Sequence, residues 1–351
     1  MTSVAIPVTM QYALNKLINN SNLSREESRS VMEIIMSGEA TSAQIAGVVT
    51  ALRIKGETKD EITGFAEVMR AHSSHLQTKQ EGLLDTCGTG GSGIHKFNIS
   101  TASSIIASAA GIRVAKHGNR AMSGKAGSAD VLEALGVQIT LTPEQASECL
   151  NRIGICFMFA QLYHPSLRHA SVPRRELGIR TIFNMLGPLT NPAGADRQLL
   201  GLYDRTKTET VASVLGELGV KRAMVVSSND GLDEISISAP TQISELLNGE
   251  VRTYELTPEE LGLARYPISE VMGGDPHVNA ALIRRIFSGE QRGAYRDIVL
   301  ANAGACIYVG GLADSLLEGA AIAAQIIDSG KAEQQLHTLI QTTGELAHVS
   351  E

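Results

Sequence analysis

The sequence is poor in cysteine, and none of its cysteines falls in a pattern that binds zinc. It has four, none forms a CxxC pair, and no set of cysteines and histidines has zinc-site spacing: Cys87, Cys149, Cys156 and Cys306. A disulfide framework and a structural zinc site are therefore not expected. We expect free thiols, mostly buried, in a reducing cytoplasm.

Long hydrophobic runs are also missing. No apolar stretch reaches the roughly 18 to 20 residues that a membrane-spanning helix needs. The first seven residues, Met1 to Pro7, carry no basic residue and no apolar core of the kind a signal peptide requires. We expect no membrane partner and a cytoplasmic location.

The composition is that of an ordinary globular protein with an excess of acid. Hydrophobic residues make up 43% and charged residues 19% of the 351, and the net charge is −7. Such values argue against long disorder. An acidic balance also disfavours general binding to nucleic acid, so we expect no nucleic-acid partner.

The first seventy residues predict helices only. Capping boxes, in which a Ser or Thr and a Glu or Gln three residues later bond each other's backbone amides, occur at Ser24 and Glu27, Thr41 and Gln44, and Thr58 and Glu61. Gly38 and Gly56 stand where helix ends are expected. The pattern predicts about four short helices between Thr9 and Ala71, followed by a polar hinge over His72 to Gly82.

Beyond this stretch, strands and helices alternate. Strands are expected at 83–87, 112–116, 155–160, 199–203 and 223–226, and helices at 101–110, at 129–135 and from Pro143 onward. Thr206 with Glu209 and Thr257 with Glu260 are expected to cap two further helices. Alternation of this kind predicts an α/β fold with a mainly parallel central sheet flanked by helices.

A glycine-rich loop, Gly88-Thr89-Gly90-Gly91-Ser92-Gly93, follows the first of these strands and precedes a helix. Glycines let several backbone N–H groups point at one anion, and a helix N-terminus adds positive potential. The spacing matches neither the dinucleotide-binding pattern nor the Walker A loop. Taken alone, the loop could equally be a tight turn without a ligand.

Acidic residues are absent between Asp85 and Asp130, although the chain as a whole is acidic. The same stretch is rich in Gly, Ser, Thr and Asn and contains seven basic or histidine side chains: His95, Lys96, Arg113, Lys116, His117, Arg120 and Lys125. A basic surface patch is the alternative, but such patches are rarely so rich in Gly and Ser. The stretch therefore favours a phosphate-binding site.

Two further segments carry candidate chemistry. The segment 164–192 combines basic side chains, Arg174 among them, with apolar residues and suits an aromatic carboxylate, or else forms a solvated basic helix. The segment 229–234 ends in Asp233 and Glu234, which could hold Mg²⁺ or belong to an ordinary acidic turn.

Taken together, these segments resemble the anthranilate phosphoribosyltransferase family over nearly the whole chain. The matching pieces, in order, are GTGG at 88–91, FNIST at 97–101, KHGNR at 116–120, RRELGIRT at 174–181, NMLGPLTNP at 184–192 and DGLDE at 230–234. The resemblance implies a nucleoside phosphorylase-like fold: a small helical domain over 1–72, to which 165–187 return, and an α/β domain over 76–164 and 192–351 that binds phosphoribosyl pyrophosphate. It also implies an active site at the hinge and a homodimer that pairs through the helical domain.

The resemblance also implies a role for individual residues. Phosphoribosyl pyrophosphate would be bound by Gly88, Thr89, Gly90, Gly91, Ser92, Asn98, Ser100, Thr101, Lys116 and Ser128. Anthranilate would be bound by Gly88, His117, Asn119, His164, Arg174, Gly187 and Pro188. Two Mg²⁺ ions, one carried in with the diphosphate, would be bound by Ser100, Asp233 and Glu234. The residues expected to act directly in catalysis are Lys116, Asn119 and Arg174.

Departures from the family pattern are few. Ser92 stands where the family loop normally has Asp, Gln161 where Pro is usual, and Val172-Pro173 inverts a common Pro-Val. Losing the loop carboxylate should alter metal or diphosphate binding without abolishing activity. Two other functions stay open at this point: a pyrimidine nucleoside phosphorylase, which shares the fold, and a non-catalytic relative that binds nucleic acid.

Overall fold

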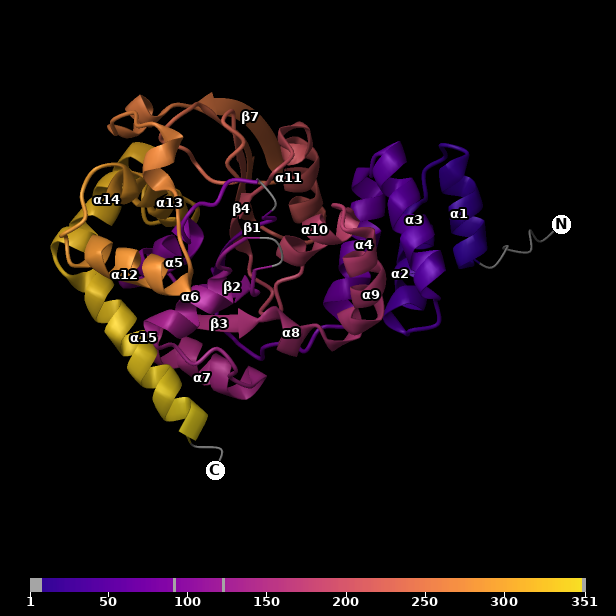
Figure 1. The fold of residues 1–351 in the computed structure, drawn as a ribbon, viewed down its shortest axis with the longest axis horizontal. Helices are drawn as coiled ribbons and strands as arrows, with labels where there is room; N and C mark the ends of the chain where they lie inside the picture. The colour runs from indigo at the N-terminus through magenta and orange to yellow at the C-terminus, as the bar shows by residue number, and fades with distance from the viewer. Residues whose placement is uncertain (1–7, 91–92, 122–123, 349–351) are drawn as a thin grey trace. The chain divides into compact units, whose positions relative to one another are not determined.

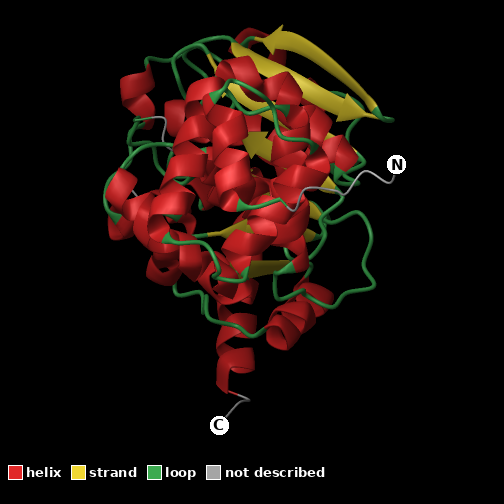
Figure 2. Ribbon diagram, turned by 90° about the vertical axis from the view of Figure 1, so that its right-hand side faces the viewer, coloured by secondary structure: helices red, strands yellow, loops and turns green. Residues whose placement is uncertain are grey.

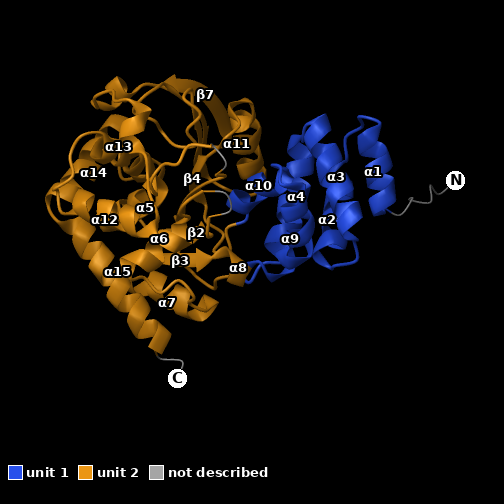
Figure 3. Cartoon of the chain, viewed as in Figure 1, with its two compact units in different colours: residues 1–74, 164–190 blue, residues 75–163, 191–351 orange. Residues whose placement is uncertain are grey.

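The computed structural model describes residues 8–90, 93–121 and 124–348, which form two compact units. One contains residues 1–74 and 164–190, and the other contains residues 75–163 and 191–351 (Figure 3). The segment that was expected to return to the helical domain, 165–187, lies within the first unit. In the described part of the chain, no helix has the length and apolar character that crossing a membrane requires.

The first unit, the helical unit, contains no strand among its described residues, as the capping pattern predicted (Figure 1). Its helices and 3₁₀ turns are α1 (Met10–Ile18), α2 (Arg25–Met36), α3 (Ser42–Lys55), α4 (Lys59–Ala71), η1 (Pro165–Leu167), α9 (Arg168–Leu177), α10 (Ile182–Leu186) and η2 (Gly187–Leu189). The four helices expected between residues 9 and 71 are therefore confirmed.

The starts of α2, α3 and α4 are fixed by the three predicted capping boxes, each with both reciprocal hydrogen bonds. Their apolar faces pack on one another, and the buried side chains at the centre, such as Val31, Leu52 and Phe65, are fully shielded from solvent. The helices α2 and α4 approach closely at Gly64, where a Cβ would lie 2.5 Å from a backbone carbonyl oxygen of α2.

The second unit, the α/β unit, alternates strands and helices in its first half. Figure 2 colours the strands yellow and the helices red. Its strands are β1 (Leu84–Gly88), β2 (Val114–Gly118), β3 (Ile155–Phe159), β4 (Arg197–Gly201), β5 (Arg222–Ser228), β6 (Thr241–Leu247) and β7 (Glu250–Leu256). Its helices are α5 (Ile99–Ala109), α6 (Ser128–Leu135), α7 (Pro143–Ile153), α8 (Ala160–Tyr163), α11 (Thr208–Glu217), α12 (Pro276–Phe287), α13 (Ala294–Val309), α14 (Leu316–Asp328) and α15 (Lys331–His348). Three 3₁₀ turns complete it: η3 (Arg205–Lys207), η4 (Pro258–Leu261) and η5 (Ile268–Val271).

The described strands form one sheet in the order β3-β2-β1-β4-β5-β6-β7. The pairs from β3 to β5 are parallel, whereas β6 and β7 add an antiparallel hairpin at one edge. Helix α5 packs against β1 and β2, and α13 packs against β1, β4 and β5. Helix α7 packs against β3, and α11 packs against β5, β6 and β7. The predicted fold class is therefore confirmed.

Several local predictions were wrong. Strand β2 begins two residues later than expected and β4 two residues earlier. Thr206 does not cap α11: it lies in η3, where its hydroxyl hydrogen-bonds to Asp204 Oδ1 at 2.6 Å, and α11 begins only at Thr208. The capping box of Thr257 and Glu260 is present, but it starts the single turn η4 and not an α-helix.

The four cysteines are free, as expected, and three of them are fully buried. They lie in the α/β unit, whose hydrophobic core includes the fully buried side chains of Ile105 and Ile106 from α5, Val114 from β2 and Ile307 from α13. This core fixes β1 and β2 under α5, and so fixes the segments that carry the acid-free stretch.

Candidate functional site

The candidate site in the α/β unit lies where parallel strands end. Strands β1 and β4 pair in register through their last residues, Gly88 and Gly201, and the N–H of Thr89 donates to the Gly201 carbonyl oxygen at 2.8 Å. Since parallel strands end at the same edge, the residues that follow them meet there. In open α/β sheets this edge is the usual position of a ligand site.

The two glycines make room for Asp233, which follows β5 in the chain. A Cβ on Gly201 would lie 1.9 Å from the Asp233 carbonyl oxygen, and a Cβ on Gly88 would lie 2.8 Å from Asp233 Oδ2. Real Cβ atoms essentially never come so close, so a larger residue at Gly201 would push the Asp233 backbone, and one at Gly88 would displace the Asp233 carboxylate. The sequence therefore brings the glycine-rich loop and the Asp233-Glu234 pair together, although they are more than 140 residues apart.

Both carboxylates are buried and share one cation, the ammonium group of Lys96. Lys96 Nζ lies 2.8 Å from Asp233 Oδ1, 2.9 Å from Glu234 Oε1 and 3.2 Å from the Asp233 carbonyl oxygen. The carboxylate side chains are 2% and 6% exposed. Burial raises the pKa of Glu234 above its ordinary value, although the charge of Lys96 offsets part of the shift. Burial lowers the pKa of Lys96, but the two carboxylates outweigh this effect and raise it overall.

The described part of the glycine-rich loop is tied to the protein by its own polar groups. Gly90 donates its N–H to Asp233 Oδ2 at 3.1 Å, and Thr89 Oγ1 accepts from the Tyr203 N–H at 3.1 Å. Gly90 has a φ of +64°, which only glycine adopts without strain. Gly91 and Ser92, which were also predicted to bind the diphosphate, lie outside the described residues.

Lys116 connects β1, β2 and the start of α5. Its side chain rises from the middle of β2 and is almost fully buried, and Nζ donates to the Thr86 carbonyl oxygen at 2.5 Å. Ser100 Oγ in the first turn of α5 lies 3.5 Å from the same nitrogen, a distance at which a hydrogen bond is weak. The ammonium group therefore stands beside the helix N-terminus, which itself favours anions.

The other polar residues predicted near the diphosphate are placed differently. Asn98 uses its amide within the protein, donating to the Ala126 carbonyl oxygen and accepting from Asn279 Nδ2 at 2.9 Å. Thr101 is fully buried, and its hydroxyl has no hydrogen-bond partner among the described residues. Ser128 Oγ donates to the Asn119 carbonyl oxygen at 3.3 Å, so it supports the loop that carries Asn119.

Three residues predicted to bind anthranilate, Gly88, His117 and Asn119, belong to the α/β unit. His117 is 6% exposed, and its backbone N–H donates to Asp85 Oδ1 at 3.1 Å. Asn119 is half-buried, and its side-chain oxygen accepts from the Arg120 N–H at 2.8 Å.

The other four predicted anthranilate residues, His164, Arg174, Gly187 and Pro188, belong to the helical unit. The guanidinium of Arg174, on α9, lies over the Phe183 ring at 5.2 Å from its centre. Burial lowers the pKa of Arg174 from its ordinary value, although an arginine stays charged in proteins. No ion pair or hydrogen bond to this guanidinium is found in residues 8–90, 93–121 and 124–348.

Sequence reasoning gave no role to two residues that the structure places at the site. Lys96 was counted only as one of the basic residues of the acid-free stretch, yet it pairs with both carboxylates. Asp85, at the near end of that stretch, is fully buried under His117, and burial raises its pKa. Nothing in the local sequence pattern signals either contact.

Comparison with known proteins places these features in a family. Residues 80–333 match the model of the glycosyl transferase family α/β domain, and residues 11–73 match its helical bundle domain. The anthranilate phosphoribosyltransferase of Brevibacillus brevis is 50% identical over 97% of this chain and 100% of its own length. That of Acetivibrio thermocellus is 50% identical over 97% of this chain and 99% of its own.

Solved structures agree with the sequence relatives. The crystal structure of anthranilate phosphoribosyltransferase from Thermus thermophilus superposes with a TM-score of 0.90 at 42% identity, covering 94% of this chain and 99% of its own. The Saccharomyces cerevisiae enzyme, in complex with phosphoribosyl pyrophosphate and Mg, superposes with a TM-score of 0.88 at 25% identity, covering 96% and 98%. The chain belongs to the anthranilate phosphoribosyltransferase family.

Proposed function

We propose that this chain transfers the phosphoribosyl group of phosphoribosyl pyrophosphate to anthranilate, giving N-(5-phosphoribosyl)anthranilate and pyrophosphate, as a step of tryptophan biosynthesis. The observation that carries the proposal is the buried Asp233-Glu234 pair at the carboxyl edge of the sheet, joined to the glycine-rich loop through the Gly90 N–H. Relatives that are 50% identical over 97% of the chain are named anthranilate phosphoribosyltransferase.

The α/β unit is the proposed diphosphate-binding domain. The helix N-terminus of α5 and the ammonium group of Lys116 supply positive potential at one place, beside Ser100. The fuller set of groups proposed to bind phosphoribosyl pyrophosphate is Gly88, Thr89, Gly90, Gly91, Ser92, Asn98, Ser100, Thr101, Lys116 and Ser128. Of these, the buried Thr101 and the half-buried Asn98 and Ser128 would act mainly by holding the loops in place.

Magnesium fits the donor set that the structure presents. Two buried carboxylates already gather around a cationic atom at 2.8 and 2.9 Å, and oxygen is the ligand that Mg²⁺ prefers. No group of three or more His, Cys, Asp or Glu side chains is arranged for a metal among the described residues, so the remaining ligands must come from elsewhere. We assign Asp233, Glu234 and Ser100 to two Mg²⁺ ions, one of which arrives with the substrate. When bound, the metal would neutralise charge on the leaving diphosphate.

Anthranilate is an aromatic carboxylate with an amine nucleophile. Arg174 would pair with its carboxylate, because the guanidinium presents a planar fork and has no acidic partner among the described residues. Asn119 would orient the amine, and the other proposed contacts are Gly88, His117, His164, Gly187 and Pro188.

The chemistry requires no strong base. An aryl amine is neutral at pH 7, so its nitrogen can attack the anomeric carbon directly while the C–O bond to the diphosphate breaks. The nitrogen, positively charged after attack, is strongly acidic and then releases its proton to water. The work of the protein is then to hold the amine in line with the sugar carbon, to stabilise the departing charge with Lys116 and to exclude water.

The reaction can be followed by the fluorescence of anthranilate. Purified protein with phosphoribosyl pyrophosphate and Mg²⁺ should consume the fluorophore, and EDTA should stop the decay. Persistence of the signal with both substrates and Mg²⁺ present would overturn the proposal. Phosphorolysis of thymidine or uridine in its place would identify a nucleoside phosphorylase.

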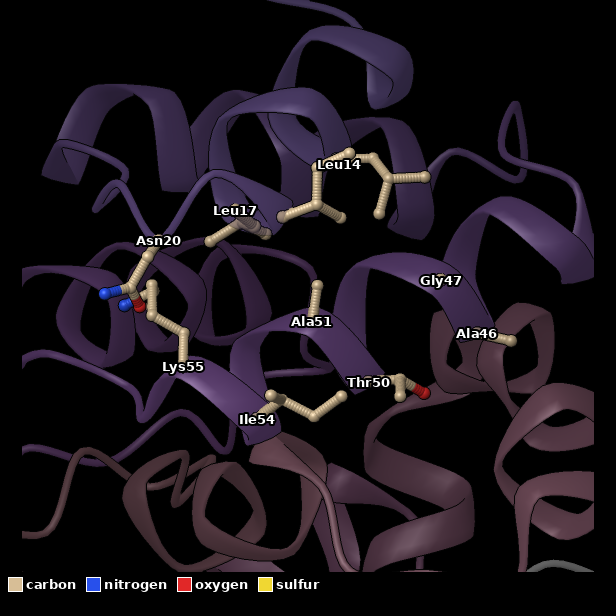
Figure 4. A pocket seen from close by; sticks show the side chains of 10 residues that line it. Leu14, Leu17, Asn20, Ala46, Gly47, Thr50, Ala51, Ile54 and Lys55 are labelled. Carbon is tan, nitrogen blue, oxygen red and sulfur yellow. The ribbon is translucent and has the colours of Figure 1, made fainter.

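We also propose a homodimer that pairs through the helical unit. Helices α1 and α3 leave an apolar groove of about 660 Å³ between them, in which Leu14 and Leu17 face Ala51 and Ile54 (Figure 4). Ile54 is 82% exposed, the highest value among the large hydrophobic side chains described. The one charged side chain of the groove, Lys55, is bound internally to Glu61 at 3.0 Å. An apolar, electrically neutral face of this kind suits a second copy of the same face.

Sedimentation velocity tests the dimer. The protein should sediment at twice its chain mass of 37.3 kDa, and Ile54→Asp should reduce the mass to that of one chain. Leu312→Asp is the matched control, since Leu312 is a 47% exposed leucine of the α/β unit and should leave the dimer intact. A monomeric parent, or a dimer that survives Ile54→Asp, would contradict the proposal.

We place the enzyme in the reducing cytoplasm, where its four free thiols are stable.

A further inference from the structure

The Lys96 ammonium group lies between the carboxylates of Asp233 and Glu234. It lies 2.8 Å from an oxygen of the first carboxylate, 2.9 Å from an oxygen of the second, and 3.2 Å from the Asp233 carbonyl oxygen. Three oxygens from two adjacent residues thus face one positive atom. The Lys96 side chain is 17% exposed, so the contact is largely shielded from solvent.

The backbone that carries Lys96 is held firmly. Lys96 forms a β-bridge with Met272, and Gly273 donates its N–H to the His95 carbonyl oxygen at 2.6 Å. A Cβ on Gly273 would lie 2.6 Å from the Phe97 nitrogen, so the two segments are in close contact. Phe97 itself is fully buried and packs edge-on against the Tyr295 ring at 5.5 Å. The Lys96 stem therefore starts from an anchored position and not from a free loop.

A nearby cation stabilises the carboxylate pair as long as both groups are ionised. Two adjacent carboxylates at 2% and 6% exposure repel each other and have lost most of their hydration. Lys116, the other buried lysine of the site, directs its ammonium group to the Thr86 carbonyl oxygen and to Ser100. Lys96 forms an ion pair with Asp233 and another with Glu234, so it is the cation that serves both carboxylates.

We infer that Lys96 is a resident counter-ion that competes with divalent metal for the Asp233-Glu234 pair. In the absence of substrate the ammonium group satisfies both carboxylates, so free Mg²⁺ binds weakly. A metal that arrives already bound to a diphosphate brings more binding energy and displaces the ammonium group. The long, flexible lysine stem lets Nζ swing away, and the free charge is then next to an anionic substrate. The inference rests on the proposed function in one respect, that the pair binds metal.

Metal binding to the protein without substrate tests this directly. Mn²⁺ serves as the probe, because its free form gives an electron paramagnetic resonance signal that disappears on binding. Lys96→Met should bind Mn²⁺ about tenfold more tightly than the parent, or better, since the competing charge is gone. Lys96→Arg keeps a charge and should bind no better than the parent.

Thermal unfolding gives a second readout that does not depend on activity. Lys96→Met should melt below the parent in EDTA, and millimolar Mg²⁺ should restore most of the loss, because a ligand that binds only the folded state stabilises it. The parent should show little response to Mg²⁺. Lys221→Met is the matched control: it removes a lysine ion pair of 3.1 Å, with Asp196, next to the start of β5, and should leave the metal response unchanged.

Equal Mn²⁺ affinity in the parent and in Lys96→Met would overturn the inference. A melting temperature of Lys96→Met that does not rise when Mg²⁺ is added would overturn it as well. If Lys96→Met does not fold, Lys96→Gln retains hydrogen-bond donors without the charge and should give the same two results. Consumption of anthranilate by the parent separates the two hypotheses. An active parent with a metal-insensitive Lys96→Met leaves the proposed function standing, whereas an inactive parent removes that function whatever the metal does.

Discussion

The carbonyl group of Asp233 occupies the space that a side chain at Gly201 would need. A Cβ at that position would lie 1.9 Å from the carbonyl oxygen and 2.7 Å from the carbonyl carbon. Both are backbone atoms, so no rotation of a side chain can relieve the overlap. The contact fixes the acidic segment after β5 against the end of β4.

Gly201→Ala should therefore displace the carboxylates and disable the enzyme. A displacement of about 1 Å at a catalytic centre costs roughly a hundredfold in rate, and overpacking costs about 1–3 kcal/mol of stability. Steady-state kinetics and thermal unfolding measure the two effects. Gly344→Ala is the control, because a Cβ there meets nothing within 4 Å and alanine favours the helix α15. Full activity in Gly201→Ala would show that the acidic segment can move without consequence.

Arg174→Ala should raise the KM for anthranilate and leave that for phosphoribosyl pyrophosphate nearly unchanged. A hydrogen bond to a charged group is worth about 1.5–3 kcal/mol, which corresponds to roughly tenfold to a hundredfold in KM. Arg174→Lys should recover only part of the loss, because an ammonium group cannot reproduce the planar fork.

Arg175→Ala provides the comparison for this prediction. Arg175 is the next residue on α9 and is exposed, whereas Arg174 is half-buried over Phe183. The KM values of Arg175→Ala should match those of the parent. An equal rise in both KM values for Arg174→Ala would remove Arg174 from the anthranilate site.

The capping glutamate of α2 makes the stability of the helical unit depend on pH. Glu27 accepts hydrogen bonds from Lys16 Nζ at 2.7 Å and from the Tyr12 hydroxyl at 2.6 Å. Burial raises the pKa of Glu27, but these two donors, the Ser24 N–H and the charge of Lys16 together outweigh burial and lower it below 4.5. A carboxyl group with a lower pKa in the folded state stabilises the protein at pH values above its pKa in the unfolded state. This contribution is lost as the pH falls through the folded-state pKa.

Glu27→Gln should accordingly lower the melting temperature at pH 7, and the difference from the parent should shrink below pH 4.5. The expected loss at pH 7 is about 1–2 kcal/mol, since both partners are partly exposed. Glu26→Gln, one residue earlier and exposed, should change stability much less. A difference between parent and Glu27→Gln that stays constant from pH 7 down to about pH 2 would contradict the assignment.

The sequence predicted the parallel part of the sheet because its strand segments alternate with helical segments along the chain. The hairpin of β6 and β7 was missed, although its signal is present. Asn248 and Gly249 connect the two strands with φ values of +53° and +81°, as the two-residue turn of a tight hairpin requires. The alternation of buried and exposed residues along β6 is interrupted at Ser244, which is fully buried and bonded to Thr208 on α11.

The ion pairs of Lys96 with Asp233 and Glu234 could not be predicted from local sequence patterns. Lys96 and Asp233 are 137 residues apart, and they meet only because β4 pairs with β1 and β5 with β4. Periodicity and capping give information about neighbouring residues within one helix or strand. An ion pair across the edge of a sheet depends instead on how several strands pair with one another. The acid-free stretch did indicate an anion site, but it gave no indication that one of its lysines binds the protein's own carboxylates.

Lys116→Met should reduce kcat/KM for phosphoribosyl pyrophosphate by about 10²–10³, the usual cost of removing one preorganised donor from a centre of developing charge. The loss should appear in kcat, because the charge on the diphosphate grows as the glycosidic bond breaks. Burial of the Thr86 carbonyl oxygen without its donor adds a stability loss of about 1–3 kcal/mol. Lys125→Met is the control, since Lys125 belongs to the same acid-free stretch but is exposed. If Lys116→Met changed only the melting temperature, Lys116 would be a structural residue that ties β1 to β2, and the stabilisation of the leaving group would have to come from another cation.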